Sequence, residues 1–74
     1  MTLADNIKTT RKIRNITQNE MADALGVNQA FISQLENGRR VPTLEMTERI
    51  ADVLDCSIDG LLERDTKYIT RLKE

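Results

Sequence analysis

The chain has 74 residues and a mass of 8.5 kDa, which leaves room for one small hydrophobic core. One cysteine and no histidine exclude an intrachain disulfide and histidine-based acid–base catalysis, and a zinc site would need carboxylates almost alone. No apolar run exceeds three residues, so we expect no membrane span and no signal peptide. The reduced thiol of Cys56 and the globular composition fit a cytoplasmic protein without metal or cofactor.

Charge is distributed unevenly along the chain, although the formal net charge is only −1. Residues 1–40 carry six basic and four acidic side chains, whereas residues 41–74 carry five basic and eight acidic ones. Contact with phosphate requires a local basic surface rather than a basic protein. The acidic net charge therefore leaves nucleic acid open as a partner, although an ordinary solvated surface explains the split equally well.

The spacing of apolar residues predicts five short helices with connections of a few residues. Side-chain oxygens of Thr2, Thr17, Asn28, Thr43 and Ser57 stand where each helix would begin, and Thr17 with Glu20 forms a capping-box sequence. The first helix is expected over 3–14, with Asn15 in a left-handed conformation after it. The second runs from 18 to a stop at Gly26, the third from Asn28 to about Glu36, and the fourth and fifth follow Thr43 and Ser57. The apolar faces of these helices are expected to carry Leu3, Ile7, Met21, Ala22, Leu25, Val27, Ile32, Leu35, Leu44, Ile50, Ala51, Leu54, Ile58, Leu61 and Leu62.

Two segments follow from this pattern, a compact domain over 1–62 and a tail over 63–74. The tail carries Tyr68, Ile69 and Leu72 at helical spacing. A sixth helix there could fold back on the core or pair with a second subunit, or the tail could fray, and the sequence leaves these alternatives open.

The stretch from 18 to 38, QNEMADALGVNQAFISQLENG, contains the most informative pattern. Two helices joined by a short turn cross steeply, which calls for a small residue at the crossing and a residue free to adopt positive φ in the turn. Ala22 and Gly26 meet these needs. The outward side of the second helix of this pair then carries Asn28, Gln29, Ser33 and Gln34. Amides and a hydroxyl are the groups that read base edges in the major groove of DNA.

This stretch resembles the helix-turn-helix of the lambda-type phage repressor and Cro family. The resemblance extends from Ile7 to about Leu62, through IKTTRK, ITQNEMADALGV, ISQLENGRRVP and LEMTERIADVLDCSIDGLL. It implies an all-α, compact five-helix bundle encoded by a bacterium or a phage. It also implies a sequence-specific transcriptional regulator of double-stranded DNA, above all a repressor that acts as a homodimer on a near-palindromic operator.

The resemblance also implies roles for particular residues. Gln18 would bind a phosphate, Gln29 would read an adenine and Ala30 would touch a thymine methyl group. Asn28, Ser33 and Gln34 would meet bases or phosphates, and Asn37, Arg39 and Arg40 would lie beside the DNA backbone. Capping, packing or plain solvent exposure are the structural alternatives for each of them. Arg11 and Glu36 are expected to form a structural ion pair between the first and third helices.

A single recognition helix reads few base pairs, so a dimer is expected, with half-sites about one helical turn (~34 Å) apart. The apolar residues expected to form its interface are Ile58, Leu61, Leu62, Tyr68, Ile69 and Leu72. No small-molecule ligand is expected.

Three other functions remain open from the sequence. An antitoxin would bind its own promoter and a toxin, and a controller protein of a restriction–modification system would activate as well as repress. A protein-interaction module would use the same helices without DNA. An enzyme is not expected, because the lone cysteine has no histidine partner and the chain has no glycine-rich phosphate loop.

Overall fold

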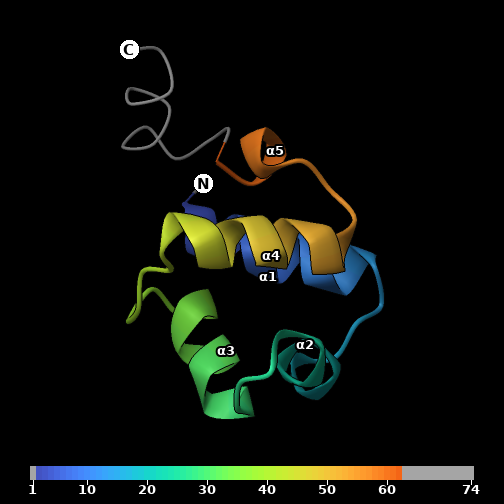
Figure 1. The fold of residues 1–74 in the computed structure, drawn as a ribbon, viewed down its shortest axis with the longest axis vertical. Helices are drawn as coiled ribbons and strands as arrows, with labels where there is room; N and C mark the ends of the chain where they lie inside the picture. Colours follow the sequence, from blue (N-terminus) through green and yellow to red (C-terminus); the bar gives the residue numbers. More distant parts are fainter. Residues whose placement is uncertain (1, 63–74) are drawn as a thin grey trace.

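The computed structural model describes residues 2–62, which form five helices, α1 (Leu3–Ile13), α2 (Gln18–Leu25), α3 (Gln29–Glu36), α4 (Leu44–Leu54) and α5 (Ile58–Leu62). Helix α4 lies in front of α1 and contacts it, with α5 above them and the α2–α3 pair below (Figure 1). The predicted all-α architecture is confirmed. The tail and its expected sixth helix lie outside the described residues. None of the described helices is long and apolar enough to cross a membrane.

Local side-chain caps start each helix where the sequence predicts. Thr2 and Thr17 form complete capping boxes with Asp5 and Glu20. Asn28, Thr43 and Ser57 each accept a hydrogen bond from the backbone three residues later. The Thr17 hydrogen bonds lower the pKa of the Glu20 carboxyl. Five short helices thus begin at fixed points, which a chain with so small a core needs because isolated short helices are marginal in water.

The core is made by all five helices. Its largest fully buried side chains are Ile7, Met21, Ile32, Leu35, Ile50, Leu54 and Leu61. Val27, Phe31 and Ile58 pack against it while half-buried. Leu44 belongs to the expected apolar face of the fourth helix, but its side chain is 67% exposed and does not join the core. It is the first residue of α4 and lies beyond the edge of the core, whereas Thr47, one turn later, is buried and bonded through its hydroxyl to the Thr43 carbonyl.

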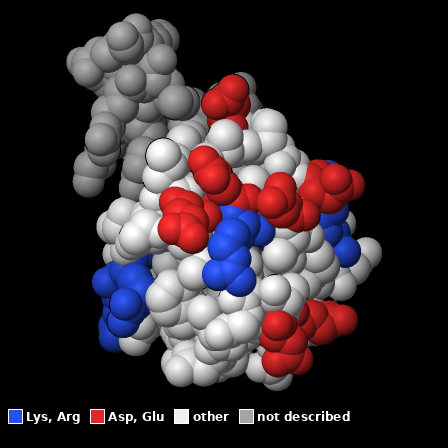
Figure 2. Space-filling model, viewed as in Figure 1, with Lys and Arg blue, Asp and Glu red and all other residues white. Residues whose placement is uncertain are grey.

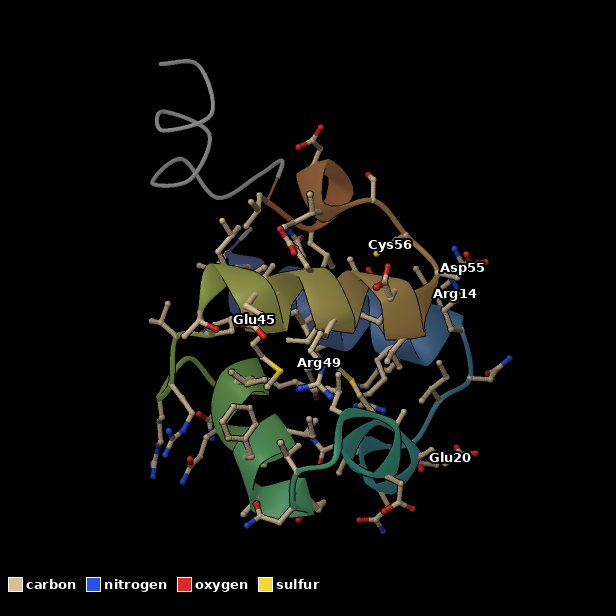
Figure 3. All side chains as sticks on the ribbon, in the orientation of Figure 1. Arg14, Glu20, Glu45, Arg49, Asp55 and Cys56 are labelled. Atoms are coloured by element: carbon tan, nitrogen blue, oxygen red, sulfur yellow. The ribbon has the colours of Figure 1, made fainter. Side chains whose placement is uncertain are left out.

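Polar groups at the helix ends also fix how the helices pack against one another. The first helix ends one residue earlier than expected, at Ile13, and Asn15 adopts the predicted left-handed conformation. Buried Asn6 of α1 donates to the Leu61 carbonyl of α5. Arg14 donates to the carbonyls of Leu54 and Asp55 at the end of α4 (Figure 3). These bonds hold α1 against α4 and α5, the scaffold on which the α2–α3 pair is mounted.

The turn between α2 and α3 depends on Gly26, which has φ +72°. A Cβ there would meet no atom within 4 Å, so a larger residue would be opposed by backbone conformation alone. We predict that Gly26→Ala lowers the free energy of unfolding by about 1–2 kcal/mol. Urea unfolding followed by circular dichroism measures this.

Asp55→Gly is the matched control, because Asp55 ends α4 with φ +53° although it is not a glycine. Relief of the same strain should stabilise the protein by up to about 1 kcal/mol. Equal effects of one sign for both variants would contradict the conformational explanation.

Candidate nucleic-acid interface

Helices α2 and α3 pack against each other across the Gly26 turn and leave one side of α3 facing outward. Gln29 and Ala30, the first two residues of α3, are exposed, and Ser33 and Gln34 are half-buried one turn later. Because Ile32 and Leu35 are buried, the polar side of α3 is presented as the sequence predicted. Its amides and hydroxyl form one short polar surface.

A hydrogen-bonded chain connects this surface to the interior. Arg11 of α1 donates to both carboxylate oxygens of Glu36, through Nε at 2.6 Å and Nη2 at 3.0 Å. Gln18 of α2 donates from Nε2 to Glu36 Oε1 at 3.0 Å. Gln29 in turn donates from Nε2 to Gln18 Oε1. Three helices thereby fix the position of the first residue of α3.

The ion pair that the resemblance implied is present and buried. The Arg11 and Glu36 side chains are 10% and 3% exposed, and Arg11 Nη1 also donates to the Ile16 carbonyl at 2.8 Å. The hydrogen bond to Glu36 raises the pKa of the Arg11 guanidinium, although burial opposes the rise. No buried side-chain nitrogen or oxygen in residues 2–62 lacks a partner.

Two expected DNA-contact residues are partly occupied by capping. The Asn28 side-chain oxygen accepts from the Phe31 amide at 2.9 Å, which leaves its amino group for a ligand. Asn37 ends α3, and its side-chain oxygen accepts from the Arg39 amide at 3.0 Å. Both residues are exposed. The expected contacts with DNA would therefore come from the Nδ2 atoms of these asparagines.

The loop after α3 folds back onto the helix. The amides of Arg39 and Arg40 both donate to the Gln34 carbonyl. The Arg40 side chain lies over the Phe31 ring, 5.1 Å from its centroid, and its Nε donates to Gln34 Oε1 at 3.0 Å. An open pocket of about 530 Å³ lies beside this pair, lined by Gly26, Val27, Asn28, Ala30, Phe31, Gln34 and Arg40. The sequence pattern did not reveal this arrangement, because it depends on the path of the loop after α3.

Acidic side chains gather along α4 with Arg49 among them, and a further basic group lies apart from them (Figure 2, Figure 3). Figure 2 shows acidic groups gathered along α4, where Glu45, Glu48 and Asp52 are exposed. A separate basic group lies at the left edge, at the loop between α3 and α4 that carries Arg39 and Arg40. On this face of the molecule, the basic surface at the end of α3 therefore favours contact with a polyanion.

Two other arginines of the described residues hold helix ends. Arg14 caps α4 (Figure 3). Arg49 of α4 donates to the Leu25 carbonyl at the end of α2 at 2.8 Å. Lys8 and Lys12 are exposed on α1.

Cys56 offers little chemistry. It is half-buried, and burial raises the pKa of its thiol, which the nearby Arg14 charge opposes. A raised pKa keeps the thiol protonated at neutral pH and makes it a poor nucleophile. Residues 2–62 contain no group of three side chains able to hold a metal ion.

The expected dimer surface needs correction at two residues. Leu61 and Leu62 are 1% and 3% exposed and belong to the core, so their side chains are not available to a second subunit. Ile58 is half-buried, and Tyr68, Ile69 and Leu72 lie outside the described residues. The large exposed apolar side chains among residues 2–62 are Ile13, Val41 and Leu44.

Two crossed helices, a positive-φ turn and a polar outer helix face define the helix-turn-helix class. Residues 7–61 match the helix-turn-helix family, and the chain belongs to it. The predicted resemblance to phage repressors is confirmed by the relatives.

The chain is 38% identical over 64 residues to the cryptic phage CTXphi transcriptional repressor RstR of Vibrio cholerae, covering 86% of this chain and 57% of the relative. It is 38% identical over 55 residues to the ImmF control region 10 kDa protein of Bacillus phage phi105, covering 74% and 61%. The chain thus spans about three fifths of the length of these relatives. The P22 c2 repressor, solved in complex with a synthetic operator, superposes with a TM-score of 0.79 at 31% identity, over 88% of this chain and 98% of that one.

The buried pair yields a stability prediction. Glu36→Leu should cost about 3–5 kcal/mol, because it leaves the buried Arg11 charge without its partner. The double variant Arg11→Met with Glu36→Leu should be more stable than Glu36→Leu, since it removes the stranded charge as well. Chemical denaturation of the wild type, Arg11→Met, Glu36→Leu and the double variant gives the coupling free energy between the two side chains. Additive losses would contradict the role of the pair as one unit.

Proposed function

We propose that this protein is a sequence-specific repressor that binds double-stranded DNA through α3 as a homodimer. The observation that carries the proposal is the hydrogen-bonded chain from the buried Arg11–Glu36 pair through Gln18 to Gln29, which holds an exposed amide in place. A side chain fixed before binding loses little conformational entropy when it meets a base. The repressor names of the relatives and the operator complex of the structural neighbour support the same function.

The free groups of Gln29 define what it would read. Its Nε2 uses one hydrogen on Gln18, which leaves the second hydrogen and Oε1. Adenine presents an acceptor, N7, beside a donor, N6, in the major groove. Gln29 therefore has the donor and acceptor needed to bind adenine bidentately while it stays attached to Gln18.

The other contacts follow from their places around α3. Ala30 is exposed on the same face and would lie against a thymine methyl group, and Ser33 would reach a base or a phosphate. Gln18 keeps one hydrogen of its Nε2 for a phosphate, which would set the register of α3 in the groove. Asn37 and Arg39 would contact the backbone beside the end of α3.

A dimer would use exposed apolar side chains near α3. Val41, in the connection from α3 to α4, is 64% exposed, and Leu44, the first residue of α4, is 67% exposed. We propose that they meet a second copy, together with Ile58 and with the tail residues Tyr68, Ile69 and Leu72.

Selection from a pool of random duplexes tests the function. We predict a two-fold symmetric motif with half-site centres about 10 base pairs apart. Gln29→Ala should then weaken binding to the selected duplex by about 1–3 kcal/mol and binding to unrelated duplex much less. An equal loss on both would remove the reading role of Gln29. No enrichment by the wild type would contradict DNA recognition and favour a protein-interaction module.

Substitution of Leu44 tests the dimer. Leu44→Glu should leave unfolding nearly unchanged, because the side chain is exposed, but should shift sedimentation equilibrium toward monomer and abolish cooperative binding to both half-sites. Ile13→Glu is the matched control, since Ile13 is 70% exposed on α1 and the end of α1 lies away from the start of α4 (Figure 1). A dimer unaffected by Leu44→Glu would place the interface elsewhere.

A further inference from the structure

Gln34 and Arg40 are joined by main-chain and side-chain contacts. The Arg40 amide donates to the Gln34 carbonyl at 3.2 Å, and Arg40 Nε donates to the Gln34 side-chain Oε1 at 3.0 Å. The guanidinium itself rests on the Phe31 ring. Gly38, with φ +78°, turns the chain so that Arg40 returns to the helix it has just left. Arg40 is thus placed by three separate contacts, although its side chain is exposed.

These contacts leave one end of the Gln34 amide free. An arginine Nε–H can only donate, so it selects the oxygen of the amide and leaves the amino group on the other side. That amino group has no hydrogen-bond partner within residues 2–62. Gln34 lines the open pocket beside α3, one turn after exposed Ala30. Because the oxygen is held toward Arg40, the amide presents its amino group to a ligand at this face, whereas a freely rotating glutamine could present either its oxygen or its amino group.

We propose that Arg40 is a positioning residue for base recognition, which holds Gln34 as a donor and restricts it to guanine or thymine. In the major groove guanine presents the acceptors N7 and O6, and thymine presents O4. Cytosine presents only an amino donor there, and adenine sets its amino donor beside N7. The two glutamines of α3 then read differently, because the Gln34 oxygen is held toward Arg40, whereas the Gln29 oxygen accepts no hydrogen bond within residues 2–62. This inference rests on the proposed DNA-binding function and deepens it.

The role differs from that of a backbone-binding arginine. Arg39 is the natural comparison, since it is exposed, carries the same charge and lies one residue earlier. Its backbone amide is bonded to Asn37 and Gln34, but its side chain makes no hydrogen bond or ion pair within the described residues. Loss of either charge weakens attraction to phosphate, whereas only loss of Arg40 releases the Gln34 amide. A measurement of base preference therefore distinguishes the loss of charge from the release of the Gln34 amide.

The experiment uses the duplex recovered by selection with the wild-type chain. Gln34→Ala first identifies the base pair that Gln34 contacts, as the position whose preference disappears. Binding constants are then measured for four duplexes that differ only at that pair. The wild type should favour guanine or thymine on the contacted strand by about fivefold or more over adenine and cytosine. Arg40→Ala should reduce this discrimination to less than about twofold and should leave preference elsewhere in the motif unchanged.

Arg39→Ala is the charge-matched control and should weaken binding to all four duplexes while keeping the discrimination. Thermal unfolding should be nearly the same for both variants, because both side chains are exposed. The proposal is overturned if Arg40→Ala behaves as Arg39→Ala does, or if the wild type prefers adenine or cytosine at that pair. A wild type that selects no sequence defeats the proposed function itself, whereas an unchanged preference in Arg40→Ala defeats only this inference.

Discussion

The buried ion pair between Arg11 and Glu36 is the constraint on which the rest of the structure depends. It spans α1 and the end of α3, and both side chains are almost fully removed from solvent. Two buried charges are stable only when each finds partners for its remaining polar atoms. The Ile16 carbonyl and the Gln18 amide supply them, so the same pair fixes the loop before α2, the start of α2 and the end of α3.

The connection to function runs through Gln18. Its amide nitrogen is committed to Glu36 and its oxygen to Gln29, so the orientation of both glutamines follows from the ion pair. In a domain of this size the hydrophobic core is small, and precision at the surface has to come from directional bonds. Stability and the proposed base recognition would thus share one set of hydrogen bonds, and a substitution at Glu36 would disturb both.

Much of the fold was predictable because its determinants are local. The caps at Thr2, Thr17 and Asn28, and the turn at Gly26, depend on residues within one helical turn of each other. The failures concern tertiary position. Leu44 fits the apolar pattern of α4 but lies past the edge of the core, and Leu61 fits an exposed interface as well as a buried helix face. Hydrophobic periodicity shows which side of a helix faces the core. It does not show how far along that helix the neighbouring helices extend.

The same limit applies to the site. The polar face of α3 follows from its buried residues, but the placement of Arg40 on Phe31 requires the path of the loop after Gly38. The roles of Arg14 and Arg49 were likewise invisible, because each bonds to a main-chain carbonyl distant in sequence. A carbonyl has no sequence signature, so an arginine that caps a helix looks like any surface arginine until the packing is known.

The commitment of those arginines limits the number of phosphates that residues 2–62 can neutralise. With Arg11, Arg14 and Arg49 hydrogen-bonded to groups of the protein itself, residues 2–62 keep only Lys8, Lys12, Arg39 and Arg40 for phosphates. Each neutralised phosphate contributes about 0.9 to the slope of log affinity against log salt, so these residues release at most about four counterions per chain. Association carried mainly by neutral amides and main-chain N–H groups would then persist at salt concentrations that strip a strongly basic protein from DNA.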